Sequence, residues 1–427
     1  VQAGADATRG SDIRTVTKAE APDAEACRTA CRMEPACQVW LFMGSWAEDH
    51  PDWGPCFLKD ARASVLEDEG HAEDAAGSCE ASDRAPGVLP LDTSTLGRVL
   101  VTGPGADSLT YQSGGWSIRW QGACADSDFA GGESIKQGLR RLLPSSVHLD
   151  STRGCVIDAP SHSTARCDPA EEEETLDAAR AADAVVVVIG EENYTEKPGD
   201  IVDLGLIDGQ VSLVQRIAAA APNVPIVLVL VEGRPRLLRG LTRTPQVKAV
   251  VHAYLPGPHG GGAVAEVLLG ITNPSGRLPL TYPSEPNAIH QHYHPVSAEC
   301  AGASVFLSAT VDECPVEFPF GRGLSYTSFN YSALRTTTAG HVAHPGVVGV
   351  SLNVTNTGSR AGRHSVLLFV SQAFRVGRTP ERQRLVGFGQ VHLAPGETGA
   401  LELSVRTQQL AFTNEFLETV VESGDYR

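Results

Sequence analysis

The chain has 427 residues, enough for two or three domains, and its 42% of hydrophobic residues supply ordinary cores. A net charge of −17 without a basic tract argues against nucleic acid or an anionic membrane as a partner. The longest apolar run, Ile226–Val231, is too short to cross a bilayer.

Cysteines and glycosylation sequons indicate the compartment. Five of the ten cysteines lie between residues 27 and 79, and N-x-S/T sequons occur at Asn193, Asn330 and Asn353. Both features favour an oxidising, secretory environment, so we expect an extracellular protein glycosylated at these asparagines. The cysteine gaps do not form the paired C-x2-C knuckles of zinc modules, so we expect disulfides and no metal.

Residues 1–83 form a small cysteine-rich module. Its first three cysteines are spaced C-x3-C-x5-C and precede Gln-Val-Trp-Leu-Phe, and its fourth precedes Phe-Leu-Lys. This pattern resembles a PAN/Apple domain, a module that binds proteins or glycans; a stapled spacer is the alternative. The resemblance implies the disulfides Cys27–Cys56 and Cys31–Cys37. Cys79 is left without a partner in this module. Its candidate partners are Cys124 and a cysteine upstream of residue 1.

Residues 84–97 are typical of a linker, and a strand is expected over 98–102. The Gly103-Pro104-Gly105 turn after it lacks both G-x-G-x-x-G and a Lys-Ser/Thr ending. A nucleotide site is therefore excluded, together with dehydrogenase and kinase functions, and we expect no cofactor.

Strands and helices then alternate, which predicts a mostly parallel α/β sheet. The expected strands lie near 147 and at 184–189, 226–231 and 249–254, and the expected helices at 134–143, 171–182, 211–221 and 263–269. A loop from Cys155 to Cys167 is expected to close on itself through a disulfide.

The central strand, 184–189, is a run of apolar, mostly β-branched residues followed by an acidic loop. Ligands of open α/β sheets lie just outside the carboxyl ends of the strands. The loop therefore delivers four carboxylates to the place where chemistry is expected: Glu191, Glu192, Glu196 and Asp200. A solvated acidic loop without function is the alternative.

A Pro-rich connection over 272–345 includes a second expected disulfide loop, Cys300–Cys314. From residue 347 apolar residues alternate with a period of two, which predicts an immunoglobulin-like β-sandwich. We place the α/β domain at 98–335 and the sandwich at 336–427, and we expect the sandwich to be cut at its last strand.

Six motifs in this region occur in the order found in family 3 glycoside hydrolases, the β-glucosidase and β-xylosidase family. They are Gly115-Trp116…Trp120-Gln121-Gly122, Gly190-Glu191…Tyr194-x-Glu196…Gly199-Asp200, Gly233-Arg234-Pro235, Leu255-Pro256-Gly257…Gly260-Gly261, Asn273-Pro274-Ser275-Gly276-Arg277-Leu278-Pro279 and Phe320-Gly321-x-Gly323-Leu324-Ser325-Tyr326. The region resembles the C-terminal α/β sandwich of that family followed by its fibronectin type III-like domain.

The resemblance implies site residues on this chain. By position, Glu191 matches the general acid/base, with Glu196 as the second candidate. Trp116 and Trp120 match the pair that stacks on the sugar, and the implied ligand is a β-glucoside or a cell-wall-type glycan.

In this family a (β/α)8 barrel supplies the nucleophile. A barrel takes about 250 residues, and fewer than a hundred precede the α/β region here. We therefore expect this chain alone to be inactive, and two hypotheses follow. It is the C-terminal part of a β-glucosidase-like enzyme whose barrel lies on a missing segment or another chain. Alternatively, it is a non-catalytic extracellular glycoprotein, a pseudoenzyme that binds glycans or self-associates through the module or an open sandwich edge.

Overall fold

The computed structural model describes residues 87–119, 124–158, 166–286, 316–338, 341–376, 378–381 and 383–427, together with the backbone of four strands nearer the N-terminus. Those strands are β1 (Asp12–Val16), β2 (Val39–Met43), β3 (Cys56–Lys59) and β4 (Asp74–Ser78). They pair antiparallel in the order β1-β3-β2-β4. The expected disulfides Cys27–Cys56, Cys31–Cys37 and Cys300–Cys314 lie outside the residues whose side chains are described.

The predicted α/β sheet is confirmed as five parallel strands in the order β11-β10-β9-β5-β6. They are β5 (Arg98–Thr102), β6 (His148–Ser151), β9 (Ala184–Gly190), β10 (Ile226–Val231) and β11 (Val247–Tyr254). β9 and β10 are buried at every position. Their continuous apolar runs therefore reflect a sheet that is covered on both faces.

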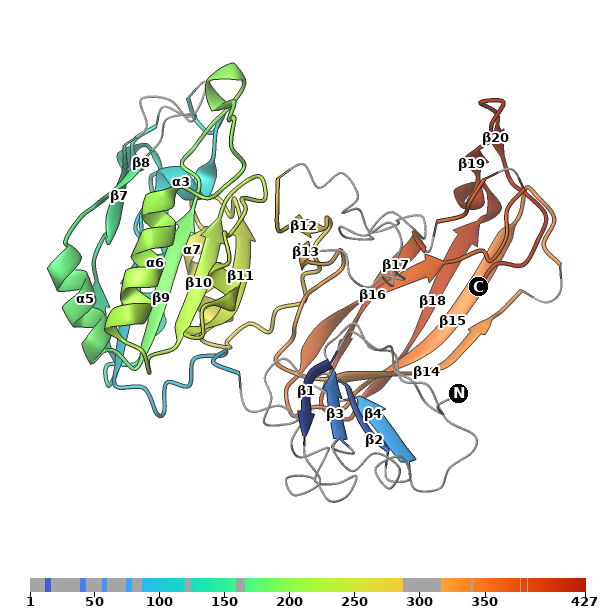
Figure 1. Cartoon of the computed structure of the whole chain (residues 1–427), viewed down its shortest axis with the longest axis horizontal. Coiled ribbons are helices and arrows are strands. Elements are labelled where there is room, and N and C mark those ends of the chain that lie inside the picture. The colour runs from blue at the N-terminus through green and yellow to red at the C-terminus, as the bar shows by residue number, and fades with distance from the viewer. Residues whose placement is uncertain are drawn as a thin grey trace.

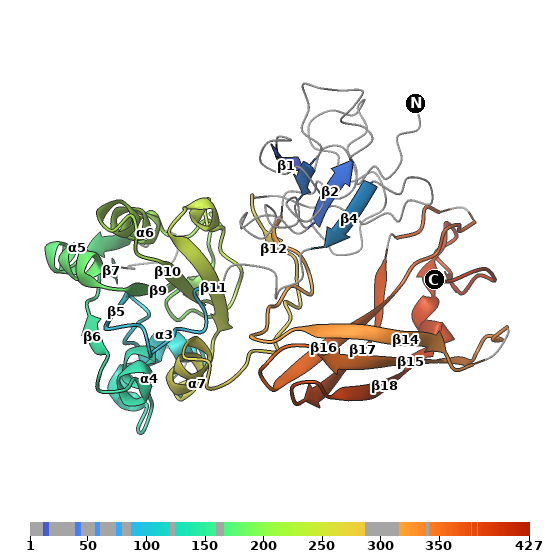
Figure 2. The same ribbon diagram turned by 90° about the horizontal axis from the view of Figure 1, so that it is seen from below.

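Helices cover the two faces of this sheet (Figures 1 and 2). α5 (Glu172–Ala181) and α6 (Asp208–Ala220) pack on one face, and α4 (Ile135–Leu142) and α7 (Gly260–Leu268) pack on the other. Alternate residues of β9 enter the two cores: Val185 and Val187 face α5 and α6, whereas Val186 and Val188 face α4 and α7. A five-residue helix, α3 (Leu109–Ser113), follows β5.

An unpredicted hairpin, β7 (Cys155–Asp158) and β8 (Arg166–Pro169), crosses the edge of the domain. The expected Cys155–Cys167 disulfide joins its strands, so the loop does close on itself. Cys124 is a free thiol whose sulfur donates to the carbonyl of Ser117 (3.0 Å). Cys79, its expected partner, lies outside the described residues.

The C-terminal region is an antiparallel β-sandwich, as predicted. One sheet contains β14 (Phe329–Thr336), β15 (Val347–Asn356) and β18 (Thr398–Arg406), and the other contains β16 (Gly362–Val370) and β17 (Arg384–Leu393). Leu352, Val354, Val366 and Leu393 pack between them. A small hairpin, β19 (Phe412–Thr413) with β20 (Thr419–Val420), follows. Because β14 pairs with β15, sandwich pairing begins at Phe329, within the segment that the sequence assigned to the α/β domain.

The segment between the two domains contains a short strand pair, β12 (Tyr282–Pro283) with β13 (Val316–Phe318), which lies between the larger sheets in Figures 1 and 2. Asn273 links this segment to the sandwich: its amide donates to the carbonyl of Ala361 (3.2 Å), and its Oδ1 accepts from the backbone of Tyr326 (2.9 Å). Within the part of the chain described, none of the helices has the length and apolarity needed to span a bilayer.

Candidate functional site

The site lies where the strand order of the α/β sheet reverses. The chain runs from β5 outward to β6, returns to β9 on the other side of β5, and continues to β10 and β11. In doubly wound sheets this switch point leaves a crevice at the carboxyl ends of the two central strands. The segment that follows β5 and α3 carries Trp116, and the loop after β9 carries the expected carboxylates.

Gly190 fixes the start of the β9 loop. Its φ is 142°, and a Cβ there would lie 2.0 Å from the carbonyl oxygen of Val231 on β10. Only glycine fits this backbone. The buried amide of Gln210 on α6 bonds both backbone groups of Gly190 at 2.8 Å. The residue that follows therefore leaves the sheet in a defined direction.

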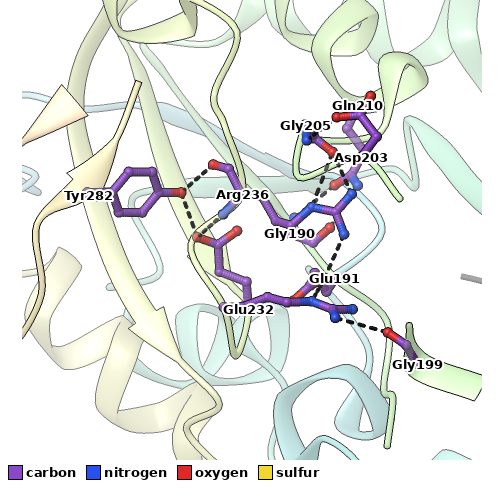
Figure 3. Close-up of polar contacts among 10 residues, drawn as sticks. Gly190, Glu191, Gly199, Asp203, Gly205, Gln210, Glu232, Arg236 and Tyr282 are labelled. Atoms are coloured by element: carbon purple, nitrogen blue, oxygen red, sulfur yellow. Dashed lines mark hydrogen bonds and ion pairs between the residues drawn. The ribbon is translucent and has the colours of Figure 1, made fainter. Parts of the chain in front are cut away.

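Glu191 is buried, with 4% of its side chain exposed. Its Oε1 accepts from Nε of Arg234 (2.8 Å) and from Nη1 of Arg236 (2.7 Å), both on the segment after β10. Figure 3 shows the contact with Arg236. These contacts make Glu191 the counter-ion of two guanidinium groups inside the domain, while a proton donor to substrate has to reach the surface.

Arg234 extends the network into the acidic loop. Its Nη1 donates to the carbonyl of Gly199 (2.9 Å), and its guanidinium carbon lies 3.9 Å from the ring centroid of Tyr194. Cation–π stacking and a charge-assisted hydrogen bond therefore act on both ends of the segment 194–199. This segment carries Glu196.

Glu196 is exposed on that segment, directly before a short 3-10 helix, Lys197–Gly199. Its backbone has φ 48° and ψ −152°, a conformation largely restricted to glycine. Strain of this kind persists only where the surrounding contacts impose it, and it clusters at functional sites. Of the two expected acid/base candidates, the geometry favours Glu196 over Glu191 for contact with a substrate.

Glu192 lies between these two carboxylates and is half-buried. Burial, and then the charge of Glu191, raises the pKa of Glu192 to about 7. On α3, burial and then the charge of Glu192 raise the pKa of Tyr111 to about 12. The loops after β5 and β9 therefore influence each other electrostatically as well as by contact.

Trp116 is 64% exposed and has a positive φ of 57°. The residue before it, Gly115, packs directly on the Glu196 loop, because a Cβ at Gly115 would lie 1.9 Å from Cγ2 of Thr195. The expected stacking residue Trp116 is thus next to the Glu196 loop, whereas Trp120 lies outside the described residues. Leu255, 37% exposed after β11, approaches Gly114 and adds apolar surface to the same edge.

The sequence reasoning missed a layer behind the loop, formed by Glu232, Arg236 and Tyr282. Glu232 and Arg236 flank the quoted Gly233-Arg234-Pro235 motif, which was assigned no role. The available signal was a carboxylate directly after a second fully buried strand, the same arrangement as Glu191 after β9. Among the described residues no group of His, Cys, Asp and Glu side chains is arranged to hold a metal ion.

Comparison with known families agrees with this geometry. Residues 83–326 match the glycosyl hydrolase family 3 C-terminal domain. The chain belongs to glycoside hydrolase family 3. Residues 364–427 of this family 3 chain match the fibronectin type III-like domain, and residues 7–59 match the PAN domain.

Two relatives within family 3 are named as a glucosidase and a xylosidase. The chain is 36% identical to the lysosomal beta glucosidase of Dictyostelium discoideum, over 90% of this chain and 45% of that protein. It is 30% identical to a beta-xylosidase of Formosa agariphila, over 79% of this chain and 44% of that protein. The solved β-glucosidase of Erythrobacter marinus superposes with a TM-score of 0.64 at 27% identity, covering 79% of this chain and 45% of that one. The chain thus spans about half the length of the curated relatives it matches.

Proposed function

We propose that this chain supplies the general acid/base of a β-glucosidase-like glycoside hydrolase, and that Glu196 is that group. The observation that carries the proposal is an exposed carboxylate in strained backbone at the switch point of the sheet, on a loop that contacts Gly115, the residue before the exposed Trp116. Relatives named as glucosidases and a xylosidase support a glycoside as substrate.

Retaining hydrolysis requires a second carboxylate about 5–5.5 Å from the acid. We propose that it belongs to a (β/α)8 barrel that packs on this edge of the sheet. Protonated Glu196 gives its proton to the glycosidic oxygen while the barrel carboxylate attacks the anomeric carbon and the C–O bond breaks. Glu196, now ionised, then takes a proton from the water that releases the sugar, and its own proton is restored.

The apolar side chains at this edge support a covering domain. Trp116 is 64%, Ile118 65% and Val202 91% exposed. Side chains of this size gain from burial against a partner, and an aromatic ring also stacks on the apolar face of a sugar. A barrel and a bound glycan together would cover them.

The test uses the protein with its barrel domain and compares Glu196→Gln with Glu191→Gln and Glu192→Gln. Loss of a general acid costs about 10²–10⁴-fold, and this loss depends on the leaving group. Glu196→Gln should lose most of its activity on a disaccharide. On a dinitrophenyl glucoside, whose leaving group needs no proton, the rate of the first step should fall only slightly. Azide should then accelerate turnover, because it attacks the glycosyl-enzyme without base assistance.

If Glu192→Gln shows this pattern and Glu196→Gln does not, the assignment to Glu196 is wrong. If wild-type protein with a barrel hydrolyses no β-glycoside, the chain is the non-catalytic alternative. We further propose that the protein is secreted and glycosylated, supported by the Cys155–Cys167 disulfide and by the exposure of Asn330 on β14. An enzymatic deglycosylation that left the mass of native protein unchanged would contradict this.

A further inference from the structure

Behind the arginine network lies a buried polar cluster to which the proposed reaction assigns no role. Glu232, directly after β10, and Tyr282, on β12, are both 0% exposed. Oε1 of Glu232 lies 2.7 Å from the hydroxyl of Tyr282 and 3.2 Å from Nε2 of His252 on β11. Figure 3 shows Tyr282 reaching both Glu232 and the carbonyl of Arg236.

The hydrogen bonds of Tyr282 require more protons than Tyr282 has. Its hydroxyl oxygen lies 2.6 Å from the carbonyl oxygen of Arg236 and 2.7 Å from Oε1 of Glu232. Two oxygens this close repel each other unless a proton lies between them. The phenol has one proton, and a carbonyl has none to give. If Tyr282 donates to Arg236, the second proton has to come from Glu232.

The groups around Glu232 come from every neighbouring element. They are His252 and Tyr254 on β11, Tyr282 on β12, Arg236 after β10 and Glu191 after β9. The nearest guanidinium, that of Arg236, directs its Nη1 to Glu191 (2.7 Å) and its Nε (3.2 Å) and Nη2 (2.5 Å) to the carbonyl of Gly205, so none of these nitrogens pairs with Glu232. The backbone N–H of Arg236, at 3.5 Å, and His252, which is charged only when protonated, also lie near Oε1. Within the described part of the chain, Oε2 of Glu232 and Nδ1 of His252 have no hydrogen-bond partner. An ionised Glu232 would be a buried charge without a guanidinium partner.

We propose that Glu232 carries a proton in the folded protein at neutral pH and that, in this form, it is the positioning residue for Arg236. The protonated carboxyl donates to Tyr282, and Tyr282 donates to the backbone of Arg236. The side chain of Arg236 then holds Glu191 and the carbonyl of Gly205, at the two ends of the loop that carries Glu196. This inference does not rest on the proposed catalytic function, because it concerns the protein without substrate.

The electrostatics agree in direction. Burial raises the pKa of Glu232 and outweighs the lowering effect of the hydrogen bonds with His252 and Tyr282 and of a charge on His252; the charge of Glu191 adds slightly to the rise. Because the folded protein then binds this proton more tightly than the unfolded chain, stability is highest below the ordinary pKa of glutamate. It falls as the pH rises from there towards the folded-state pKa.

The first test is Glu232→Gln, which keeps the shape and neutrality of the protonated acid and can still donate to Tyr282. We expect the melting temperature of the variant minus that of wild type to rise by about 3–5 °C per pH unit between about pH 5 and pH 7. Glu402→Gln, which replaces an exposed carboxylate on β18, is the matched control. Its melting temperature minus that of wild type should not change with pH. Titration of Glu192 affects wild type and variant alike, so its effect cancels in the difference between their melting temperatures.

A Glu232→Gln variant that is less stable than wild type at neutral pH, or that fails to fold, would mean that Glu232 is ionised and would overturn the proposal. A protonated-carboxyl band in the infrared spectrum of wild type at pH 7, absent from Glu232→Gln and retained in Glu192→Gln, checks the same point without relying on stability.

The positioning role has its own readout. Hydrogen exchange of residues 191–206, corrected for the intrinsic effect of pH, should stay slow in wild type up to neutral pH and quicken at higher pH, where Glu232 loses its proton. It should stay constant in Glu232→Gln. If the stability difference has the expected slope but loop exchange does not respond, Glu232 is protonated without positioning the loop, and that half of the proposal is wrong.

Discussion

The guanidinium of Arg234 lies 3.9 Å above the ring of Tyr194 while its Nε holds Glu191 at 2.8 Å. One side chain from the β10 end thus fixes the β9 loop both at its first residue and beside Glu196. The same loop contacts Gly115, so the arrangement also fixes the position of the backbone directly before Trp116.

Arg234→Lys should loosen this loop although it keeps the charge, because an ammonium can neither stack flat on Tyr194 nor donate to Glu191 and Gly199 in the same fork. We expect hydrogen exchange of residues 191–200 to rise at least about tenfold. We also expect kcat on a disaccharide to fall about 10²-fold in the barrel-containing protein, the cost of a misplaced catalytic group. Arg239→Lys, which removes an exposed fork to Asp203 and Asp208, is the control and should change neither.

Glu191→Gln should be severely destabilising, because it leaves two guanidinium groups inside the domain without their carboxylate. Removing one partner of a buried ion pair costs about 3–5 kcal/mol, and urea denaturation measures it. The exposed Glu196→Gln should stay within about 0.5 kcal/mol of wild type. Equal stabilities for the two variants would show that the carboxylate of Glu191 is not needed for folding.

Loss of the Cys155–Cys167 disulfide in the double serine variant should lower stability by about 3 kcal/mol, as expected for a closed loop with a sequence separation of 12. Thermal melts with and without reductant measure this loss. Cys124→Ser removes a free thiol and should leave the melting temperature unchanged. A reductant effect on wild type that persists in the double variant would have to come from other cysteines.

Trp116→Ala should weaken sugar binding while leaving the stability of the fold unchanged. The ring is mostly exposed, so the free energy of unfolding should change by less than about 0.5 kcal/mol. Loss of aromatic stacking should weaken sugar binding by about 0.5–1.5 kcal/mol, seen as a rise in KM or in the Kd for glucose. An unchanged Kd in the barrel-containing protein would mean that Trp116 does not line the sugar site.

The sheet was predictable because β9 and β10 are continuous apolar runs that only a strand covered on both faces explains. The β7–β8 hairpin was missed because its strands are four residues long and it lies where the sequence shows only a cysteine loop. The acidic loop follows β9 as the sequence predicts, but which of its carboxylates is exposed was not accessible from the sequence. Whether Glu191 or Glu196 faces outward depends on Arg234 and Arg236, more than 40 positions away. An ion pair between residues so far apart in the chain produces no periodic pattern in the local sequence from which it could be predicted.

Tyr282 lies on the connecting segment, yet it is wholly buried in the core of the α/β domain and bonded to Arg236. Its strand is completed only by β13, residues 316–318. A fragment that stops at the last helix, α7, would therefore lack a core side chain and the donor to the Arg236 carbonyl. We therefore expect the α/β domain to need the chain at least as far as Phe318 in order to fold, so a domain dissection or fusion should cut after that point.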